Sequence, residues 1–198
     1  MPARIRIRPP DESDCFELLA RHKTPEHVIR HSRTVCGVAM YLAGKLVKKG
    51  YDLDLDLIRA AALLHDITKS HSFKRPLDHA LTGAKLLKKL GYHEVAAIVR
   101  QHVRLSRSRP RGRISEVEVV NYADKRVVED RITTLSDRID YIRRRYGITS
   151  ERRSIIDKYS AYTFNLEQEI FEVLAEEPAR IMFIDVEKEC KNHESRSA

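Results

Sequence analysis

Six ionisable side chains stand where amphipathic helices normally carry core residues. They are four histidines and two aspartates: His31, His65, Asp66, His79, His102 and Asp124. The ring of His31, for example, shares one helical face with Val35 and Val38. Because burying a lone carboxylate costs several kcal/mol, such residues facing one interior need each other or cations as partners.

A bound metal ion would satisfy the whole set at once. Four imidazoles and two carboxylates offer mixed nitrogen and oxygen donors, which suit transition-metal ions better than calcium. No cysteine lies on these stripes, which disfavours a structural zinc site. Each histidine taken alone is more often a hydrogen-bonded core residue, so the metal hypothesis depends on the joint pattern.

Apolar residues three and four positions apart predict helices along most of the chain. The predicted helices are 11–22, 25–49, 53–66, 76–90, 93–103, 115–146 and 149–175. Polar loops are expected at 69–76 and at 104–113, the second with five arginines and no acid. The fold class is therefore all-α, a helical bundle around a buried metal site.

The chain is expected to form one domain with two extensions. The N-terminal extension with a short helix is 1–24, the metal-binding domain is 25–147, and the C-terminal helical extension packed on the same domain is 148–198. A chain of 198 residues with 42% hydrophobic residues can bury a real core. Seven glycines and seven prolines are too few for collagen-like, low-complexity or turn-rich β proteins.

Charge and cysteine usage favour an intracellular protein with an anionic partner. Lysine and arginine number 37 against 29 acids, and the net charge of +8 suits a nucleotide, a nucleic acid or an acidic protein surface. Cys15, Cys36 and Cys190 are an odd number without CxxC spacing, which is not typical of a disulfide framework. No apolar run approaches a signal peptide or the ~20 residues of a membrane span. A cytoplasmic location and no membrane partner are expected.

The ordered set resembles the HD-domain metal-dependent phosphohydrolases. That family places a His, a His-Asp pair and a distant Asp on helices, and here these are His31, His65-Asp66 and Asp124. The sequence AALLHDITK at 61–69 looks like the central motif of the family. The sequence NYADKR at 121–126 is similar to the last motif of the diadenosine-tetraphosphate hydrolases. The resemblance covers about 25–131.

His79 and His102 resemble the two-metal subgroup, which also includes cyclic-dinucleotide phosphodiesterases. The resemblance then implies two divalent ions per chain, iron or manganese before nickel, cobalt, magnesium or zinc. Asp66 would bridge two shells, which are completed by His31, His65 and Asp124 on one side and by His79 and His102 on the other. The implied function is hydrolysis of a phosphoester or phosphoanhydride bond in a nucleotide or related small phosphate compound by a metal-bound hydroxide. Thr68 replaces the glycine of many relatives and a Gly-Tyr-Pro motif is absent, which disfavours cyclic-di-GMP.

Three basic residues are candidates for contacting a substrate phosphate. Lys69, one turn beyond the His-Asp pair, is placed to act with Asp66 in catalysis by reaching a phosphate oxygen as charge develops. Arg104 opens the arginine-rich loop, for which a solvated surface is the simpler interpretation. Arg131 shares a helical face with Asp124, seven residues earlier.

Two other functions stay open beside the enzyme. One is a nucleotide-sensing HD domain with little catalysis, although the presence of all six expected ligands argues against a degenerate site. The other is a nucleic-acid-binding module, which binding that weakens with salt and shows no turnover would favour. The expected partner is a small phosphorylated substrate, and a homo-oligomer remains open.

Overall fold

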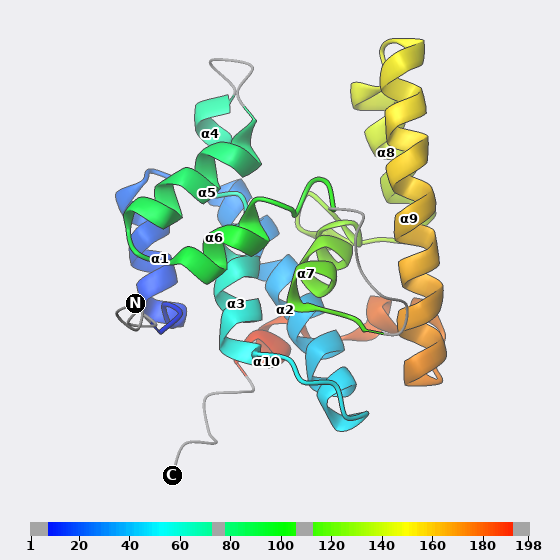
Figure 1. Cartoon of the computed structure of the whole chain (residues 1–198), viewed down its shortest axis with the longest axis horizontal. Coiled ribbons are helices and arrows are strands. Elements are labelled where there is room, and N and C mark those ends of the chain that lie inside the picture. Colours follow the sequence, from blue (N-terminus) through cyan, green and yellow to red (C-terminus); the bar gives the residue numbers. More distant parts are fainter. Residues whose placement is uncertain (1–7, 73–77, 106–112, 192–198) are drawn as a thin grey trace, which may run out of the picture.

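Helices make up most of the computed structural model, which describes residues 8–72, 78–105 and 113–191 (Figure 1). They are α1 (Glu12–Arg21), α2 (Glu26–Lys48), α3 (Leu55–Leu64), α4 (Lys69–Ser72), α5 (His79–Lys89), α6 (His93–Val99), α7 (Glu116–Asp124), α8 (Leu135–Tyr146), α9 (Ser150–Leu174), the 3₁₀ helix η1 (Pro178–Phe183) and α10 (Val186–Lys191). One antiparallel hairpin, β1 (Val127–Val128) with β2 (Arg131–Ile132), is the sole sheet of the described residues. The predicted all-α fold class is confirmed. None of the helices in these ranges has both the length and the apolar character that a membrane span requires.

The helices α2 and α3 form the centre of the molecule. Every residue from Leu57 to Leu64 is buried, so α3 has no solvent-facing side over that length. The helix α2 packs against α3, α7 and α10, while α3 also contacts α1 and α6. Buried side chains of these helices belong to one apolar core. Because such cores are close-packed, they hold the two site-bearing helices in fixed positions.

Two predicted helices end earlier than their periodicity suggests, and each ends near a histidine. The helix α3 stops one residue before His65, and α6 stops three residues before His102. The ring Nδ1 of His65 lies 2.8 Å from the carbonyl oxygen of Ala62, and that of His102 lies 2.7 Å from the carbonyl oxygen of Val99. Carbonyl groups of a last helical turn have no amide partner within the helix, so these rings cap the ends that carry them.

Two predicted loops fall partly outside the described residues. The segment 69–76 begins as the short helix α4 rather than as a loop, and 73–77 are not described. The following helix begins at His79 with Asp78 as its N-cap, and not at residue 76. Of the arginine-rich segment, 106–112 lie outside the described ranges.

The single helix predicted over 115–146 is wrong, because the β1–β2 hairpin separates α7 from α8. Val127, Val128 and Ile132 are β-branched, which favours a strand. Glu129 adopts a φ of 56°, and this left-handed conformation reverses the chain. The turn brings the carbonyl oxygen of Glu129 to 2.6 Å from Nδ1 of His31. The β1–β2 hairpin, which the helical pattern did not predict, therefore orients the ring of His31.

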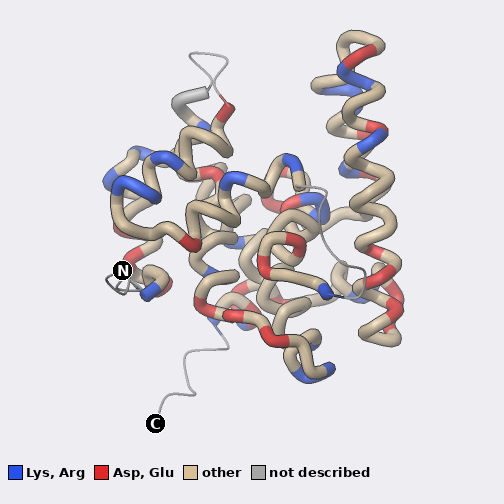
Figure 2. Tube along the Cα trace, viewed as in Figure 1, with Lys and Arg blue, Asp and Glu red and all other residues tan. Residues whose placement is uncertain are grey.

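The helices α8 and α9 form a helical hairpin along one side of the molecule, and the end where they join projects past α7 (Figure 1). The first half of α9 carries Arg152 and Arg153, whereas its second half is rich in glutamate (Figure 2). Apart from Ser160, the buried residues of α9 lie in its second half. Burial thus fixes the second half, and the first half is largely exposed, with Ile155 among its exposed residues.

The cysteine prediction also needs correction, because Cys36 and Cys190 form a disulfide with an S–S distance of 2.16 Å. Cys15 is buried and not paired. The bonded residues are 154 positions apart in the sequence, so local spacing gives no sign of the pairing. At the neighbouring Gly37 an added Cβ would lie 2.7 Å from the carbonyl oxygen of Val186. The close packing of α10 on α2 brings the two sulfur atoms together.

Candidate metal centre

The structure brings the six predicted ligands together from separate helices. His31 lies on α2, His65 and Asp66 follow α3, His79 begins α5, His102 follows α6 and Asp124 ends α7. Five of these residues are no more than 5% exposed, and the side chain of His79 is 27% exposed. Packing of the central helices, rather than proximity in the sequence, produces this convergence.

Asp66 lies between two pairs of histidines. Its Oδ2 is 3.3 Å from Nε2 of His65 and 3.8 Å from Nε2 of His31. Its Oδ1 is 3.4 Å from Nε2 of His79 and 3.6 Å from Nε2 of His102. Each oxygen of this carboxylate thus lies close to its own pair of ring nitrogens.

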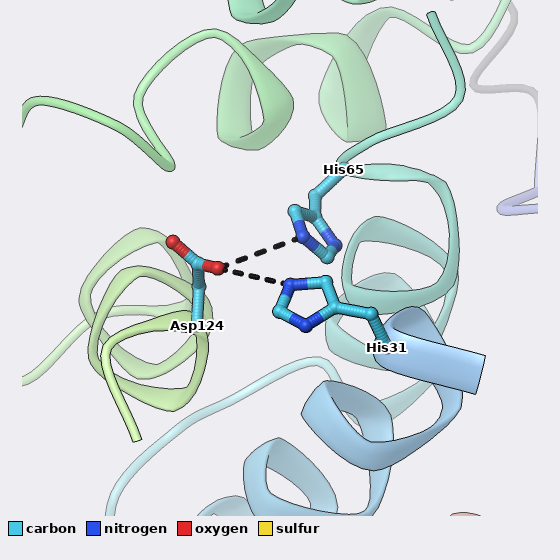
Figure 3. Close-up of side chains that lie close together, drawn as sticks. All are labelled: His31, His65 and Asp124. Atoms are coloured by element: carbon cyan, nitrogen blue, oxygen red, sulfur yellow. Dashed lines mark hydrogen bonds and ion pairs between the residues drawn. The ribbon is translucent and has the colours of Figure 1, made fainter. Parts of the chain in front are cut away.

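Asp124 completes one side of this arrangement (Figure 3). Its Oδ1 lies 3.2 Å from Nε2 of His31 and 3.8 Å from Nε2 of His65, and the three side chains point toward one another. Two groups have donor atoms close enough together to hold a metal ion: His31, His65 and Asp124, and His65, Asp66 and His102.

Backbone carbonyl groups determine which ring nitrogen faces the carboxylates. The Nδ1 atoms of His31, His65 and His102 each lie between 2.6 and 2.8 Å from a backbone carbonyl oxygen. A carbonyl oxygen only accepts hydrogen bonds, so Nδ1 carries the hydrogen and Nε2 of the neutral ring keeps its lone pair. Metal-binding histidines are commonly oriented in this way.

Neutral rings and carboxylates cannot satisfy one another in this cluster, because both present acceptors. Nε2 of His65 and Oδ1 of Asp66 are buried with no hydrogen-bond partner. Leaving such groups unpaired inside a protein is costly. Divalent cations between the rings and the carboxylates would satisfy both kinds of donor, so the residues present fit a metal centre.

Both carboxyl groups remain ionised at this site. Burial opposes ionisation of Asp66, but a positive charge on His65 when that ring is protonated, together with the charge of Lys69, lowers the pKa of Asp66 well below the usual value. Burial likewise opposes ionisation of Asp124, and the charge of Lys125 contributes most to lowering its pKa. The cluster therefore offers anionic oxygen donors.

His79 is the most exposed of the six residues, and its Nε2 lies 3.2 Å from Nε2 of His102. Burial lowers the pKa of His79 to about 4. The ring is therefore neutral near pH 7, which leaves it able to bind a metal ion.

Three cationic side chains surround the two carboxylates. Lys69 Nζ donates to Oδ2 of Asp66 at 2.5 Å, and Lys125 Nζ donates to Oδ2 of Asp124 at 2.7 Å. Nη2 of Arg138, which reaches the site from α8, is 3.6 Å from Oδ1 of Asp124. The Nε atom of Arg138 is buried and has no hydrogen-bond partner. Positive charge thus lies beside the cluster, where an anionic substrate would approach.

The residues expected to contact substrate have different positions. Lys69 and Arg104 line a cavity of about 640 Å³ that contains the site, whereas Arg131 is exposed on β2 and is not among the lining residues. The hairpin breaks the helix that would have put Arg131 on the face of Asp124. Arg138, which lines the cavity, was missed by the sequence analysis. It shares a helical face with the buried Leu135, three residues earlier, and with Ile142, four residues later, so the search for ionisable residues on apolar stripes could have found it.

Fold and site together define a metal-binding helical domain, and the family comparison agrees. The model of the HD domain family matches residues 28–142, which is more than half of the chain. The chain belongs to the HD domain family.

Several proteins of known sequence are similar to parts of this chain. An uncharacterized protein of Methanocaldococcus jannaschii is 37% identical over 79 residues, 39% of this chain and 46% of that protein. A tRNA (cytidine(56)-2'-O)-methyltransferase of Picrophilus torridus is 28% identical over 76% of this chain and 41% of its own length. Ribonuclease Y of Clostridium perfringens is 42% identical over 37% of this chain and 13% of its own length. The chain thus spans less than half the length of these relatives.

One solved structure aligns with most of this chain. It is a predicted HD superfamily hydrolase from an uncultured Thermotogales bacterium, 22% identical, with a TM-score of 0.46. The alignment covers 82% of this chain and 92% of that one.

Proposed function

We propose that this protein is a metal-dependent phosphohydrolase that cleaves a phosphoester or phosphoanhydride bond in a nucleotide or a related small phosphate compound. One observation carries the proposal: histidine Nε2 atoms face ionised carboxylates at one end of a cavity whose lining also includes lysine and arginine side chains among apolar and aromatic ones. The histidines and carboxylates together require divalent cations, and the basic side chains of the cavity favour an anionic substrate. Membership in the HD domain family supports the same chemistry.

Two divalent ions are proposed, with Asp66 shared between them. The remaining ligands are His31, His65 and Asp124 for one ion and His79 and His102 for the other. This mixture of nitrogen and oxygen donors favours iron or manganese, with nickel, cobalt, magnesium or zinc as substitutes. Such ions supply an activated water nucleophile at neutral pH and polarise a phosphoryl oxygen.

Lys69 and Arg138 are proposed to hold the substrate phosphate. Burial alone would lower the pKa of Lys69, but the charges of Asp66 and Asp124 raise it, so the ammonium group stays protonated. Arg138 has a buried Nε without a partner and can donate more than one hydrogen bond from its planar fork. Both groups stabilise negative charge that develops on non-bridging oxygens, because they are already positioned before the reaction.

Names of the relatives widen the set of substrates to test. Ribonuclease Y and the tRNA methyltransferase both act on RNA by name. Phosphodiesters of nucleic acids therefore belong in a screen beside nucleoside phosphates and dinucleoside polyphosphates. Tight nucleotide binding without hydrolysis of any of these would favour the sensing alternative.

Elemental analysis joined to this screen tests the proposal. Protein purified without chelator should contain divalent metal and hydrolyse at least one compound with added Mn²⁺ or Fe²⁺. A matched pair of variants gives the control: His65→Ala should lose metal and turnover, while His93→Ala, which changes an exposed histidine on α6, should keep both. Full hydrolysis after exhaustive chelation, or wild-type metal content in His65→Ala, contradicts the proposal.

A further inference from the structure

The cavity extends well beyond the metal centre, to a wall built by α8 and the first half of α9. Tyr146 of α8 and Ile155 and Tyr159 of α9 are part of this wall. Tyr146 is 51% exposed and Ile155 is 43% exposed, so the cavity opens to solvent at the projecting end of the two helices. A single phosphate held at the metal centre would occupy only the opposite end.

Part of the positive charge that lines the cavity has no acidic partner in the described residues. Arg104, Arg145 and Arg152 line the cavity and form no ion pair within the ranges that the structure describes. Arg143, which points elsewhere, pairs with Asp157 at 2.7 Å. Positive charge on the side that faces the cavity is thus left uncompensated by these three arginines' neighbours, and it can attract a second anionic group of a ligand.

The distance along α8 separates the two ends of the cavity. Arg138 lies beside Asp124 at the metal centre, and Arg145 follows seven residues later. Seven residues of helix span about 10 Å along the axis. Successive phosphates of one nucleic-acid strand lie about 3.4 Å apart along a duplex axis, so this span corresponds to more than one nucleotide step.

Aromatic rings alternate with these cations. The guanidinium of Arg104 lies 5.7 Å from the ring centre of Tyr159, and that of Arg145 lies 5.8 Å from the ring centre of Tyr146. Rings on which bases stack, beside cations that follow a backbone, are typical of surfaces that bind single strands. A polyphosphate without bases would not stack on the tyrosines, and a mononucleotide bound at the metal centre would not reach the arginines at the far end of the cavity.

We infer that the cavity binds a single-stranded oligonucleotide, with the reacting phosphodiester at the metal centre and the neighbouring nucleotides along α8 and α9. This inference rests on the proposed function and narrows its substrate class. Arg145 and Arg152 contact a second phosphate, and Tyr146 and Tyr159 stack on bases.

Chain-length dependence of hydrolysis tests the inference. Metal-loaded protein is assayed on bis(p-nitrophenyl) phosphate, a dinucleotide and a pentanucleotide, the last two as RNA and as DNA. The ratio of kcat/KM for the pentanucleotide to that for bis(p-nitrophenyl) phosphate should fall about tenfold or more in the Arg145→Ala, Arg152→Ala double variant, chiefly through KM. Arg144→Ala, which removes an exposed arginine from the same helix but outside the cavity lining, should keep the wild-type ratio.

Binding gives an independent measure. Anisotropy of a fluorescein-labelled pentanucleotide over a range of salt should show a slope of log K against log salt that falls by about 1.4 in the double variant, since each single-strand phosphate contact contributes about 0.7. Equal kcat/KM for the dinucleotide and the pentanucleotide, or equal ratios in the double variant and Arg144→Ala, overturns the inference and leaves the proposed function standing. Absence of all hydrolysis refutes the proposed function, and the salt slopes still decide whether the arginines bind a strand.

Discussion

The two walls of the cavity differ in burial and in the pairing of their charges. On the wall formed by α2, α3 and α7, ligand side chains are almost fully buried, and Lys69 and Lys125 are paired with carboxylates. On the wall formed by α8 and α9, Tyr146 is half exposed, and Arg145 and Arg152 line the cavity without acidic partners in the described residues. The first wall is fixed before any ligand arrives, as a reaction centre requires, and the second can adjust to what it binds.

Loss of Asp66 should have the largest effect, because this residue serves both proposed shells. Asp66→Ala leaves four histidines and one aspartate without the shared anion, so both ions should bind weakly. Turnover should drop by about a thousandfold or more. Metal analysis and steady-state kinetics check this, with His93→Ala as control, and a variant that keeps wild-type metal content would show that Asp66 is not a bridge.

Loss of His79 or His102 should lower activity less than loss of Asp66, because each histidine contributes to only one of the two proposed ions. His79→Ala and His102→Ala should each lower the metal content from about two ions to about one per chain, since each removes half of the terminal ligands of one ion. Circular dichroism verifies that the variants fold. An unchanged content of one ion in both would rule out a dinuclear site and limit these rings to packing or to substrate contact.

Lys69→Ala should slow turnover while leaving metal content intact. Its ammonium group contacts Asp66 but is not a metal donor, and loss of one preorganised charge contact typically costs about a hundredfold in kcat. Metal analysis and kcat are measured on the same preparation. Wild-type kcat would limit the role of Lys69 to its ion pair with Asp66.

The same contrast explains which features the sequence could predict. His31, His65 and Asp124 interrupt strong apolar stripes, and burial of those stripes is what brings the residues together. The all-α class followed from the same periodicity. Arg145 and Arg152 lie on a largely exposed pair of helices that also carries Arg144 and Arg153 outside the cavity lining, so the sequence did not distinguish the arginines that face the cavity.

The break between α7 and α8 shows where helical periodicity misleads. Positions 124, 131 and 138 are spaced by heptads and would share one face of a continuous helix. The valines and Ile132 fit that helix as well as they fit the observed strands, and the left-handed Glu129 that decides between them is not a residue typical of turns. Similarly, the disulfide depends on how α10 packs against α2, which spacing cannot show.

Arg138 and Arg131 give the prediction with the smallest expected effect. The structure indicates Arg138 as a phosphate contact, whereas the sequence pattern indicated Arg131. Arg138 lines the cavity and lies 3.6 Å from Asp124, so its loss removes a charge-assisted contact to the substrate phosphate. Such a contact is worth about 1.5 kcal/mol, and Arg138→Ala should therefore lower kcat/KM about tenfold. Arg131→Ala changes an exposed side chain on β2, and kcat/KM should stay within about twofold of wild type. Comparison of kcat/KM for the two variants at equal metal content decides between the two assignments. A larger loss in Arg131→Ala than in Arg138→Ala would mean that the substrate approaches over the hairpin and not along α8.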